Sequence, residues 1–211
     1  MKFEWPSSLS RQDMSDLVDL MNTVSTRETT LGFYEPIAEA TGLAMMEALD
    51  ADIRGGALNL LIARDAPGER IVGMLILARQ TLPARRHIVE MKRCVIEPAY
   101  RGRFVPDGWR LALERVQEMG CDMIVIDVRS DGKAEQLWRR LGFVEYGRLD
   151  DYARVNGRVI TGYFLRAYVK DVLAHRNREQ TYWHRSGAAD ERRQDAGVKV
   201  LETASADHAD V

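Results

Sequence analysis

The sequence is poor in the residues that build metal centres and nucleophilic sites. It holds four histidines and two cysteines among 211 residues, and three of the histidines lie in a polar stretch beyond residue 174. Only His87 falls inside the apparent domain, which excludes a histidine-rich metal centre there. Cys94 and Cys121 are too far apart for a zinc knuckle or a CxxC redox pair and suit a reducing cytoplasm. An enzyme of this composition depends on carboxylates, tyrosines, backbone amides or a bound cofactor.

The chain also lacks a long apolar run and an excess of charge of one sign. Its longest apolar run, 71–78, is far shorter than the roughly 20 residues of a membrane-spanning helix. The N-terminal MKFEWPSSLS has no apolar core of the kind found in a secretory signal. The 30 basic residues nearly balance the 32 acidic ones and leave a net charge of −2. We therefore expect a cytoplasmic protein with no nucleic-acid or membrane partner.

Length and composition predict one domain with an appendage. Hydrophobic residues make up 45% of the chain, and a chain of this size buries roughly 70% of its extended surface on folding. From about residue 173 onward aliphatic residues thin out and charges alternate in sign. We therefore divide the chain into a domain over 1–172 and a polar tail over 173–211, which we expect to be disordered or loosely docked.

Apolar periodicity and turn residues predict the order helix, helix, three strands, helix, strand, helix and two strands. A first helix is expected from the N-cap Ser10 to about Val24, followed by a polar connector. A second helix is expected from about Glu35 to Ile53, where a glycine pair stops it. Strands are expected at 58–64, 71–80, 87–96, 123–128, 143–155 and 158–165, and helices at 108–119 and 133–141.

The loop EPAYRGRFVPDG connects the third expected strand to the next helix. Unpaired amides and the positive end of the dipole stabilise a phosphate at a helix N-terminus. Arg101 and Arg103 add charge and forked donors at this place. The alternative is an ordinary connection whose arginines face solvent.

Two segments resemble the signatures of the GNAT superfamily of N-acetyltransferases. VIEPAYRGRFVPDGWRLALERV resembles the acyl-CoA-binding pattern V-x-P-x-x-R-G-x-G-x-G/A, and VRSDGKAEQLWRRLGFVEYG resembles the pattern N-x-x-A-x-x-L-Y-x-x-x-G-F. The second segment is also similar to a branch that acetylates small molecules, including amine-bearing antibiotics or toxins. The resemblance covers roughly 10–169 and implies an α/β (α+β) fold with a central mixed, mostly antiparallel twisted sheet flanked by helices.

The sequence departs from both signatures. Phe104 stands at the first loop glycine and Pro106 at the second, unless an insertion makes Gly108 the equivalent residue. Asp131 replaces the asparagine of the second signature, and Trp138 replaces its tyrosine. In the family that tyrosine commonly protonates the departing thiolate, whereas an indole N–H donates a hydrogen bond but delivers no proton. The resemblance assigns donor binding to Cys94, Val95, Ile96, Arg101, Gly102, Arg103, Phe104, Gly108, Asp131 and Trp138.

The resemblance implies transfer of an acetyl group from acetyl-CoA to the primary amine of a small molecule by direct attack. Backbone amides near Cys94 to Ile96 would hold the oxyanion. Glu90 is our leading candidate for the base, since strand alternation places it with Lys92, Cys94 and Ile96 on one face. The alternative is a plain salt bridge between Glu90 and Lys92. Weaker candidates for the base are Glu97 and His87.

Two other tyrosines are candidates to replace the missing tyrosine as the acid that protonates the thiolate. Tyr146 and Tyr152 lie in the strand after the second signature, where each could also be a packed aromatic. The two N-terminal helices should form much of the acceptor wall, and their polar residues favour a cationic or polar amine: Glu28, Tyr34 and Glu35. A non-catalytic module that binds a CoA ester or recruits a partner, transfer of a different acyl group, and a homodimer stay open.

Overall fold

The computed structural model describes residues 1–28, 35–66, 70–130 and 132–174. Asp131, Tyr34 and the tail from 175 onward, all named above, lie outside the described residues. The expected order of elements is confirmed, with one additional strand at the N-terminus. In chain order the elements are β1 (Lys2–Glu4), α1 (Arg11–Glu28), α2 (Glu39–Arg54), β2 (Leu58–Arg64), β3 (Ile71–Arg79), β4 (Ile88–Ile96), α3 (Arg101–Glu118), β5 (Met123–Arg129), α4 (Ala134–Arg140), β6 (Val144–Val155) and β7 (Arg158–Tyr168).

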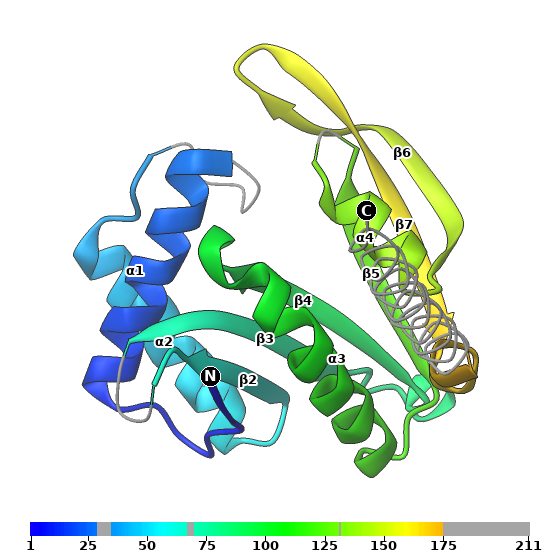
Figure 1. Ribbon diagram of the computed structural model, residues 1–211, viewed down its shortest axis with the longest axis horizontal. Helices are drawn as coiled ribbons and strands as arrows, with labels where there is room; N and C mark the ends of the chain where they lie inside the picture. The colour runs from blue at the N-terminus through cyan, green and yellow to red at the C-terminus, as the bar shows by residue number, and fades with distance from the viewer. Residues whose placement is uncertain (29–34, 67–69, 131, 175–211) are drawn as a thin grey trace, which may run out of the picture.

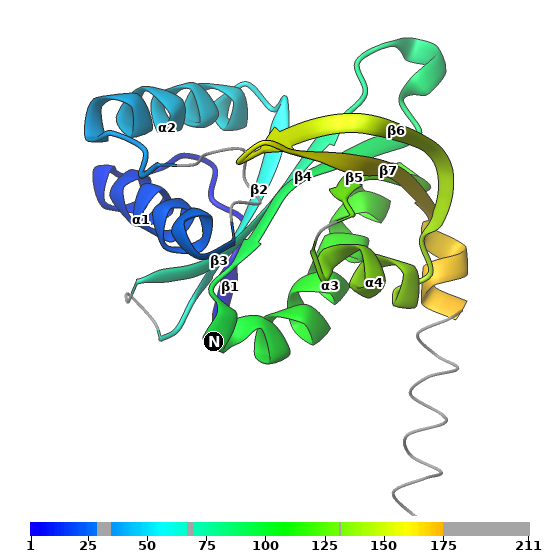
Figure 2. The ribbon, with the colours of Figure 1, turned by 90° about the horizontal axis from the view of Figure 1, so that it is seen from above.

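The strands form one seven-stranded sheet in the order β1-β2-β3-β4-β5-β7-β6. Every neighbouring pair is antiparallel except β4 and β5, which are parallel. The mixed, mostly antiparallel sheet implied by the resemblance is thus confirmed. Helices α1 and α2 cover one face of the sheet, and α3 and α4 cover the other (Figure 2).

Two hydrophobic cores lie on the two faces of the sheet. In β3, Met74 and Ile76 pack into the core beneath α1 and α2, whereas Leu75 and Leu77 pack into the core beneath α3 and α4. Successive side chains of a strand point to opposite faces. A strand that is covered on both faces is therefore apolar at nearly every position, which explains the continuous apolar run of β3.

Three expected helix boundaries were wrong. Helix α1 continues to Glu28 instead of ending near Val24, and α2 begins at Glu39 instead of Glu35. Helix α3 begins at Arg101 rather than near residue 108, after a short 3-10 turn over Pro98–Tyr100. The expected loop is therefore mostly the first two turns of a helix.

The early start of α3 has a physical reason in its apolar residues. Phe104, Gly108 and Ala112 follow one another at intervals of four and are all buried. Pro106 lies inside this helix, where its missing N–H leaves only the carbonyl of Gly102 without its usual donor. The segment is therefore helical because helix formation buries the Phe104 ring, although its glycine and proline residues predicted a loop.

Candidate functional site

Strands β4 and β5 form a fork in the middle of the sheet. Their parallel pairing joins only Ile88–Glu90 to Met123–Val125. Beyond these residues β4 stays paired with β3 and β5 with β7, so the two strands diverge (Figure 1). In the described chain, β4 beyond Glu90 has no strand partner on its β5 side, which leaves backbone amides available inside the fork.

A β-bulge lies in β4 directly after Glu90 and Lys92. The register with β3 shifts by one residue between Met74 and Ile76, and Arg93 has a φ of 47°. An extra residue reverses the alternation of side chains along a strand.

The expectation that Glu90, Lys92, Cys94 and Ile96 share one face was therefore wrong. Glu90 and Lys92 pair with Ala78 and Ile76 on the face of α1 and α2, whereas Cys94 and Ile96 pack toward α3 and α4. The Glu90 carboxylate and the Cys94 thiol therefore lie on opposite faces of the sheet.

A small apolar cavity of about 20 Å³ lies between the fork, α3 and α4. Trp138 of α4 lines it and packs edge-on against Trp109 at 5.6 Å and Phe143 at 5.4 Å between ring centroids. Burial raises the pKa of Cys94, another lining residue, to about 12, so its thiol stays protonated. The lining residues are Leu75, Cys94, Ile96, Phe104, Val105, Trp109, Leu137, Trp138 and Leu141.

The N-terminus of α3 lies at the end of β4. The amide of Arg101 donates to the Pro98 carbonyl of the preceding 3-10 turn, and the amides of Gly102 and Arg103 follow in the first turn of α3. Arg103 is exposed, and its guanidinium lies 4.9 Å from the ring centroid of Tyr100. The Arg101 guanidinium instead donates to the Glu28 carboxylate at 2.7 Å and to the Ile96 carbonyl at 3.3 Å. The two arginines of the signature therefore have different surroundings.

Phe104 is a core residue in this structure. Its side chain is 2% exposed and lies between Gly73 of β3 and Gly108 of α3, against both Cα positions. Its ring also packs edge-on against Phe3 of β1, at 5.4 Å. A bound acyl-CoA could contact only the backbone of Phe104 and Gly108, because the Phe104 side chain is buried in the core.

Two of the three candidates for the base form salt bridges. Glu90 is half-buried and forms a salt bridge with Lys92 at 3.1 Å, as the alternative interpretation expected. Glu97 forms a salt bridge with Arg70 at 2.7 Å. His87 precedes β4, and its carbonyl accepts the amides of Asp122 and Met123 at the start of β5. Of the three, Glu90 lies closest to the branch point of the fork.

The two candidate tyrosines lie on the β6–β7 hairpin. Tyr146 is 55% exposed, and its ring lies 6.3 Å from that of Phe164. The Tyr152 hydroxyl donates a hydrogen bond to Asp127 of β5. Burial, together with the carboxylate of Asp127, raises the pKa of Tyr152 to about 12. Asp127 was not among the expected site residues, although a carboxylate within the apolar run MIVIDV was a signal.

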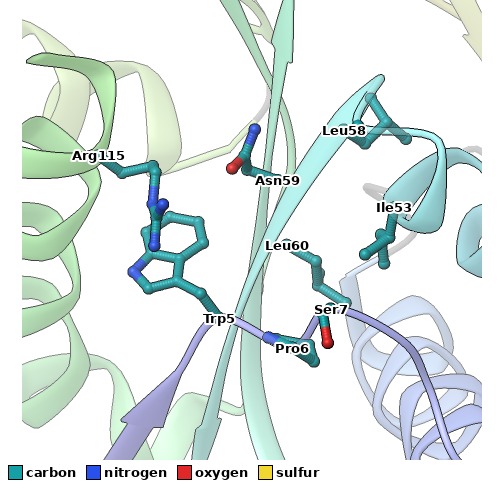
Figure 3. Close-up of a pocket in the computed structure, with 9 residues that line it drawn as sticks. Trp5, Pro6, Ser7, Ile53, Leu58, Asn59, Leu60 and Arg115 are labelled. Atoms are coloured by element: carbon teal, nitrogen blue, oxygen red, sulfur yellow. The ribbon is translucent and has the colours of Figure 1, made fainter. Parts of the chain in front are cut away.

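A larger cavity, of about 260 Å³, lies at the edge of β2 (Figure 3). Trp5 and Arg115 form one wall, with the guanidinium 4.8 Å from the centroid of the Trp5 rings. The cavity is separated from the fork by β3 and shares no lining residue with the apolar cavity there.

The described residues contain no group of histidine, cysteine or acidic residues that could hold a metal. None of their helices is long and apolar enough to cross a membrane.

Comparison of structures gives clear matches. A provisionally assigned acetyltransferase from Acinetobacter baylyi superposes with a TM-score of 0.65 and 20% identity over 79% of this chain and 92% of the other. Spermidine N-acetyltransferase from Vibrio cholerae, a single-residue variant, gives 0.62 and 21% over 82% and 98%. A ribosomal-protein-alanine N-acetyltransferase from Brucella melitensis gives 0.64 and 16% over 80% and 99%.

The chain has the GNAT fold. No protein-family model and no curated protein matches the sequence, so the likeness is one of structure. Within the GNAT fold the two segments that resemble the signatures fall at the fork: the first forms the end of β4 and the start of α3, and the second forms α4 and its flanks.

Proposed function

We propose that the protein is an N-acetyltransferase that moves an acetyl group from acetyl-CoA to a primary amine of a small molecule. The observation that carries the proposal is the fork between β4 and β5, which lies next to the N-terminus of α3. Similar structures support it: a provisionally assigned acetyltransferase from Salmonella typhimurium, with a TM-score of 0.62 and 15% identity over 80% of this chain and 94% of the other, contains acetyl-CoA as its cofactor.

The residues around the fork fit such a donor. The amides of Gly102 and Arg103, with the Arg103 guanidinium, hold the pyrophosphate at the start of α3. The apolar cavity beside Cys94, Ile96 and Trp138 receives the thioester end. A cavity of about 20 Å³ has room for about one water-sized group, so the lining side chains must move apart to admit an acyl group.

Glu90 acts as the base on the opposite face of the fork. It takes one proton from the acceptor ammonium, directly or through a water, and the neutral nitrogen forms a bond to the thioester carbon. The free amides of β4 stabilise the oxyanion, and one such donor is worth roughly 3 to 4 kcal/mol. The carbon–sulfur bond then breaks and the sulfur leaves as a thiolate. A thiol of this kind has a pKa of about 8.5, so its thiolate leaves without a positioned acid, although more slowly than with one.

Release of free CoA thiol tests the proposal. Acetyl-CoA is offered with a panel of amino acids, polyamines, aminoglycosides and peptides, and at least one of them should give turnover. Glu90→Gln should slow that turnover most at low pH, where the amine is hardest to deprotonate. Glu97→Gln is the matched control, because Glu97 pairs with Arg70 and should leave the rate nearly unchanged. The proposal fails if saturating acetyl-CoA neither raises the melting temperature nor gives a calorimetric signal.

A second candidate function is a non-catalytic module that binds a CoA ester. The observation that favours it is Trp138, buried against Trp109 and Phe143, where the family places a proton donor. Such a module would bind acetyl-CoA without releasing thiol in the presence of any amine. Robust turnover with one amine eliminates this candidate.

A further inference from the structure

A carboxylate and three aromatic rings gather on the face of the sheet that carries Glu90. Glu90 pairs with Val125 of β5, and Asp127, two residues farther along β5, therefore points to the same face. Asp127 pairs in turn with Phe164 of β7. Asp127 is exposed and accepts the hydrogen bond from Tyr152.

The β6–β7 hairpin is shaped to bring Tyr152 to this place. The register of β6 shifts between Leu149 and Ala153, so that an extended bulge carries Tyr152 out of the regular alternation. The Tyr152 ring then crosses β7 over Gly162: a β-carbon at Gly162 would lie 2.3 Å from the ring carbon Cγ. The ring stands edge-on to Phe164 at 6.2 Å between centroids. A bulge and a glycine thus let a side chain from β6 reach Asp127 two strands away.

This arrangement suits an organic cation. An ammonium is attracted both by a carboxylate and by the faces of aromatic rings. Asp127 lies next to Phe164 and Tyr152, and the Tyr146 ring lies 6.3 Å from that of Phe164. Three cationic residues lie on the same face and would favour an anionic ligand instead, so an anion is the alternative to test. Lys92 pairs with Glu90, and Arg166 lies 5.3 Å from the Tyr168 ring centroid. The charge of Arg129 acts on the Tyr152 phenol.

A cation held at Asp127 is unlike the amine that reacts. The carboxylate and the rings stabilise the charged form of a bound ammonium and so raise its pKa, whereas attack on a thioester requires a neutral nitrogen. Glu90 is already paired with Lys92, 3.1 Å away, so a nitrogen beside Glu90 meets less net negative charge than one beside Asp127. The two carboxylates are therefore fitted to two different nitrogens.

We propose that Asp127, Tyr152 and Phe164 form a subsite for a second cationic group of the acceptor, so that the favoured substrates are diamines acetylated at the other end. This inference rests on the proposed function of the fork. The Cα of Asp127 lies about 7 Å along β5 from the partner of Glu90, and neighbouring strands are about 4.8 Å apart. Because β4 and β5 diverge beyond this pair, the Cα atoms of Glu90 and Asp127 are at least about 8 Å apart, a separation of the order of the length of a linear diamine such as cadaverine.

Three amines of equal chain length test the subsite: cadaverine, pentylamine and δ-aminovalerate. We expect kcat/KM to be about tenfold higher for cadaverine than for pentylamine, mostly through a lower KM, since a cation between a carboxylate and aromatic rings is worth that much. Asp127→Asn should remove this preference, and Tyr152→Phe should weaken it. Asp52→Asn, which changes an exposed carboxylate at the end of α2, should leave it unchanged. Equal use of the three amines, or a preference for δ-aminovalerate, overturns the subsite.

Calorimetric titration with cadaverine alone separates the two proposals. The wild-type protein should bind cadaverine without acetyl-CoA, and Asp127→Asn should bind it about tenfold more weakly. If none of the three amines releases thiol but this difference in binding is found, the proposed function fails and the cation subsite stands. If thiol is released but cadaverine binds equally well to both proteins, the subsite is wrong and the proposed function stands.

Discussion

The ring of Phe104 lies against Gly73 with no room for a side chain between them. A β-carbon at Gly73 would stand 2.6 Å from Cδ2 of Phe104, inside van der Waals contact. The same ring is enclosed by Gly108 from its own helix. Phe104 occupies the place of a glycine in the signature that the segment resembles, and two other glycines of the chain accommodate its bulk.

Gly73→Ala should therefore destabilise the fold, because the added methyl group must displace a fully buried ring. Overpacking of this kind costs about 1 to 3 kcal/mol, measurable as a lower midpoint of urea unfolding. Gly102→Ala is the matched control, since nothing lies within 4 Å of the added carbon. The double variant Gly73→Ala/Phe104→Leu should recover part of the loss. Equal midpoints for Gly73→Ala and Gly102→Ala would contradict the packing described.

The two arginines of the first signature should differ in their effect on acetyl-CoA binding. Arg103 is exposed next to the first turn of α3, whereas Arg101 is engaged with Glu28 and the Ile96 carbonyl. We expect Arg103→Ala to raise the Kd for acetyl-CoA about tenfold, the loss of one charge-assisted contact. Arg101→Ala should raise it less and lower the melting temperature more. Calorimetry and thermal unfolding measure both, and a larger loss of affinity for Arg101→Ala would reverse the assignment.

The order of the elements could be predicted because each had its own period and its own turn residues. The additional strand β1 could not, since three residues give no periodicity and β1 depends on its pairing with β2. The start of α3 was missed because the prediction gave weight to glycine and proline between 102 and 108. Phe104 at helical spacing from Gly108 and Ala112 was the contrary signal.

The faces of the candidate site could be predicted only in part. Simple alternation placed Glu90 and Cys94 together, and the bulge at Arg93 separates them. Nothing in a single sequence marks an extra residue in a strand when that residue is an ordinary arginine. Asp127 and Tyr152 meet through a second bulge and through Gly162, a relationship across three strands that no local pattern contains.

The ion pairs around Arg64 should make stability depend on pH in the acid range. Arg64 is largely buried and binds Asp13 and Glu4, joining α1 and β1 to β2. Burial alone would raise the pKa of Asp13, but hydrogen bonds from Arg64 and Ser10 hold this pKa below its usual value of 3.8.

A carboxyl whose pKa is lowered by folding stabilises the protein above its unfolded pKa and loses this effect as the pH falls through its folded pKa. Asp13→Asn should therefore lower the free energy of unfolding at pH 7, by about 1 to 3 kcal/mol. The difference from wild type should shrink as the pH falls below 3.8. Asp19→Asn, at an exposed position of α1, is the control. A difference that is constant from neutral to acid pH would exclude this origin.

Trp138→Tyr should make the proposed acetyl transfer faster. Trp138 lines the cavity assigned to the thioester end, and its indole N–H cannot supply the proton that the departing thiolate takes up. A phenol at this position can, and a positioned acid accelerates such a step by roughly a hundred- to ten-thousand-fold. We expect kcat to rise at least about tenfold, with the Kd for acetyl-CoA nearly unchanged. Both quantities come from thiol release and calorimetry at one pH.

Trp138→Phe separates proton donation from packing. Both substitutions replace the indole that packs against Trp109 and Phe143, and both should lower the melting temperature by a similar amount because they remove similar apolar contacts. Only the tyrosine brings a hydroxyl into the cavity. A rise in kcat for Trp138→Tyr that Trp138→Phe does not share assigns the slow step of the wild-type protein to thiolate departure. Equal rates for the two variants would show that the leaving group needs no acid here, and that Trp138 acts only by filling the space beside the fork.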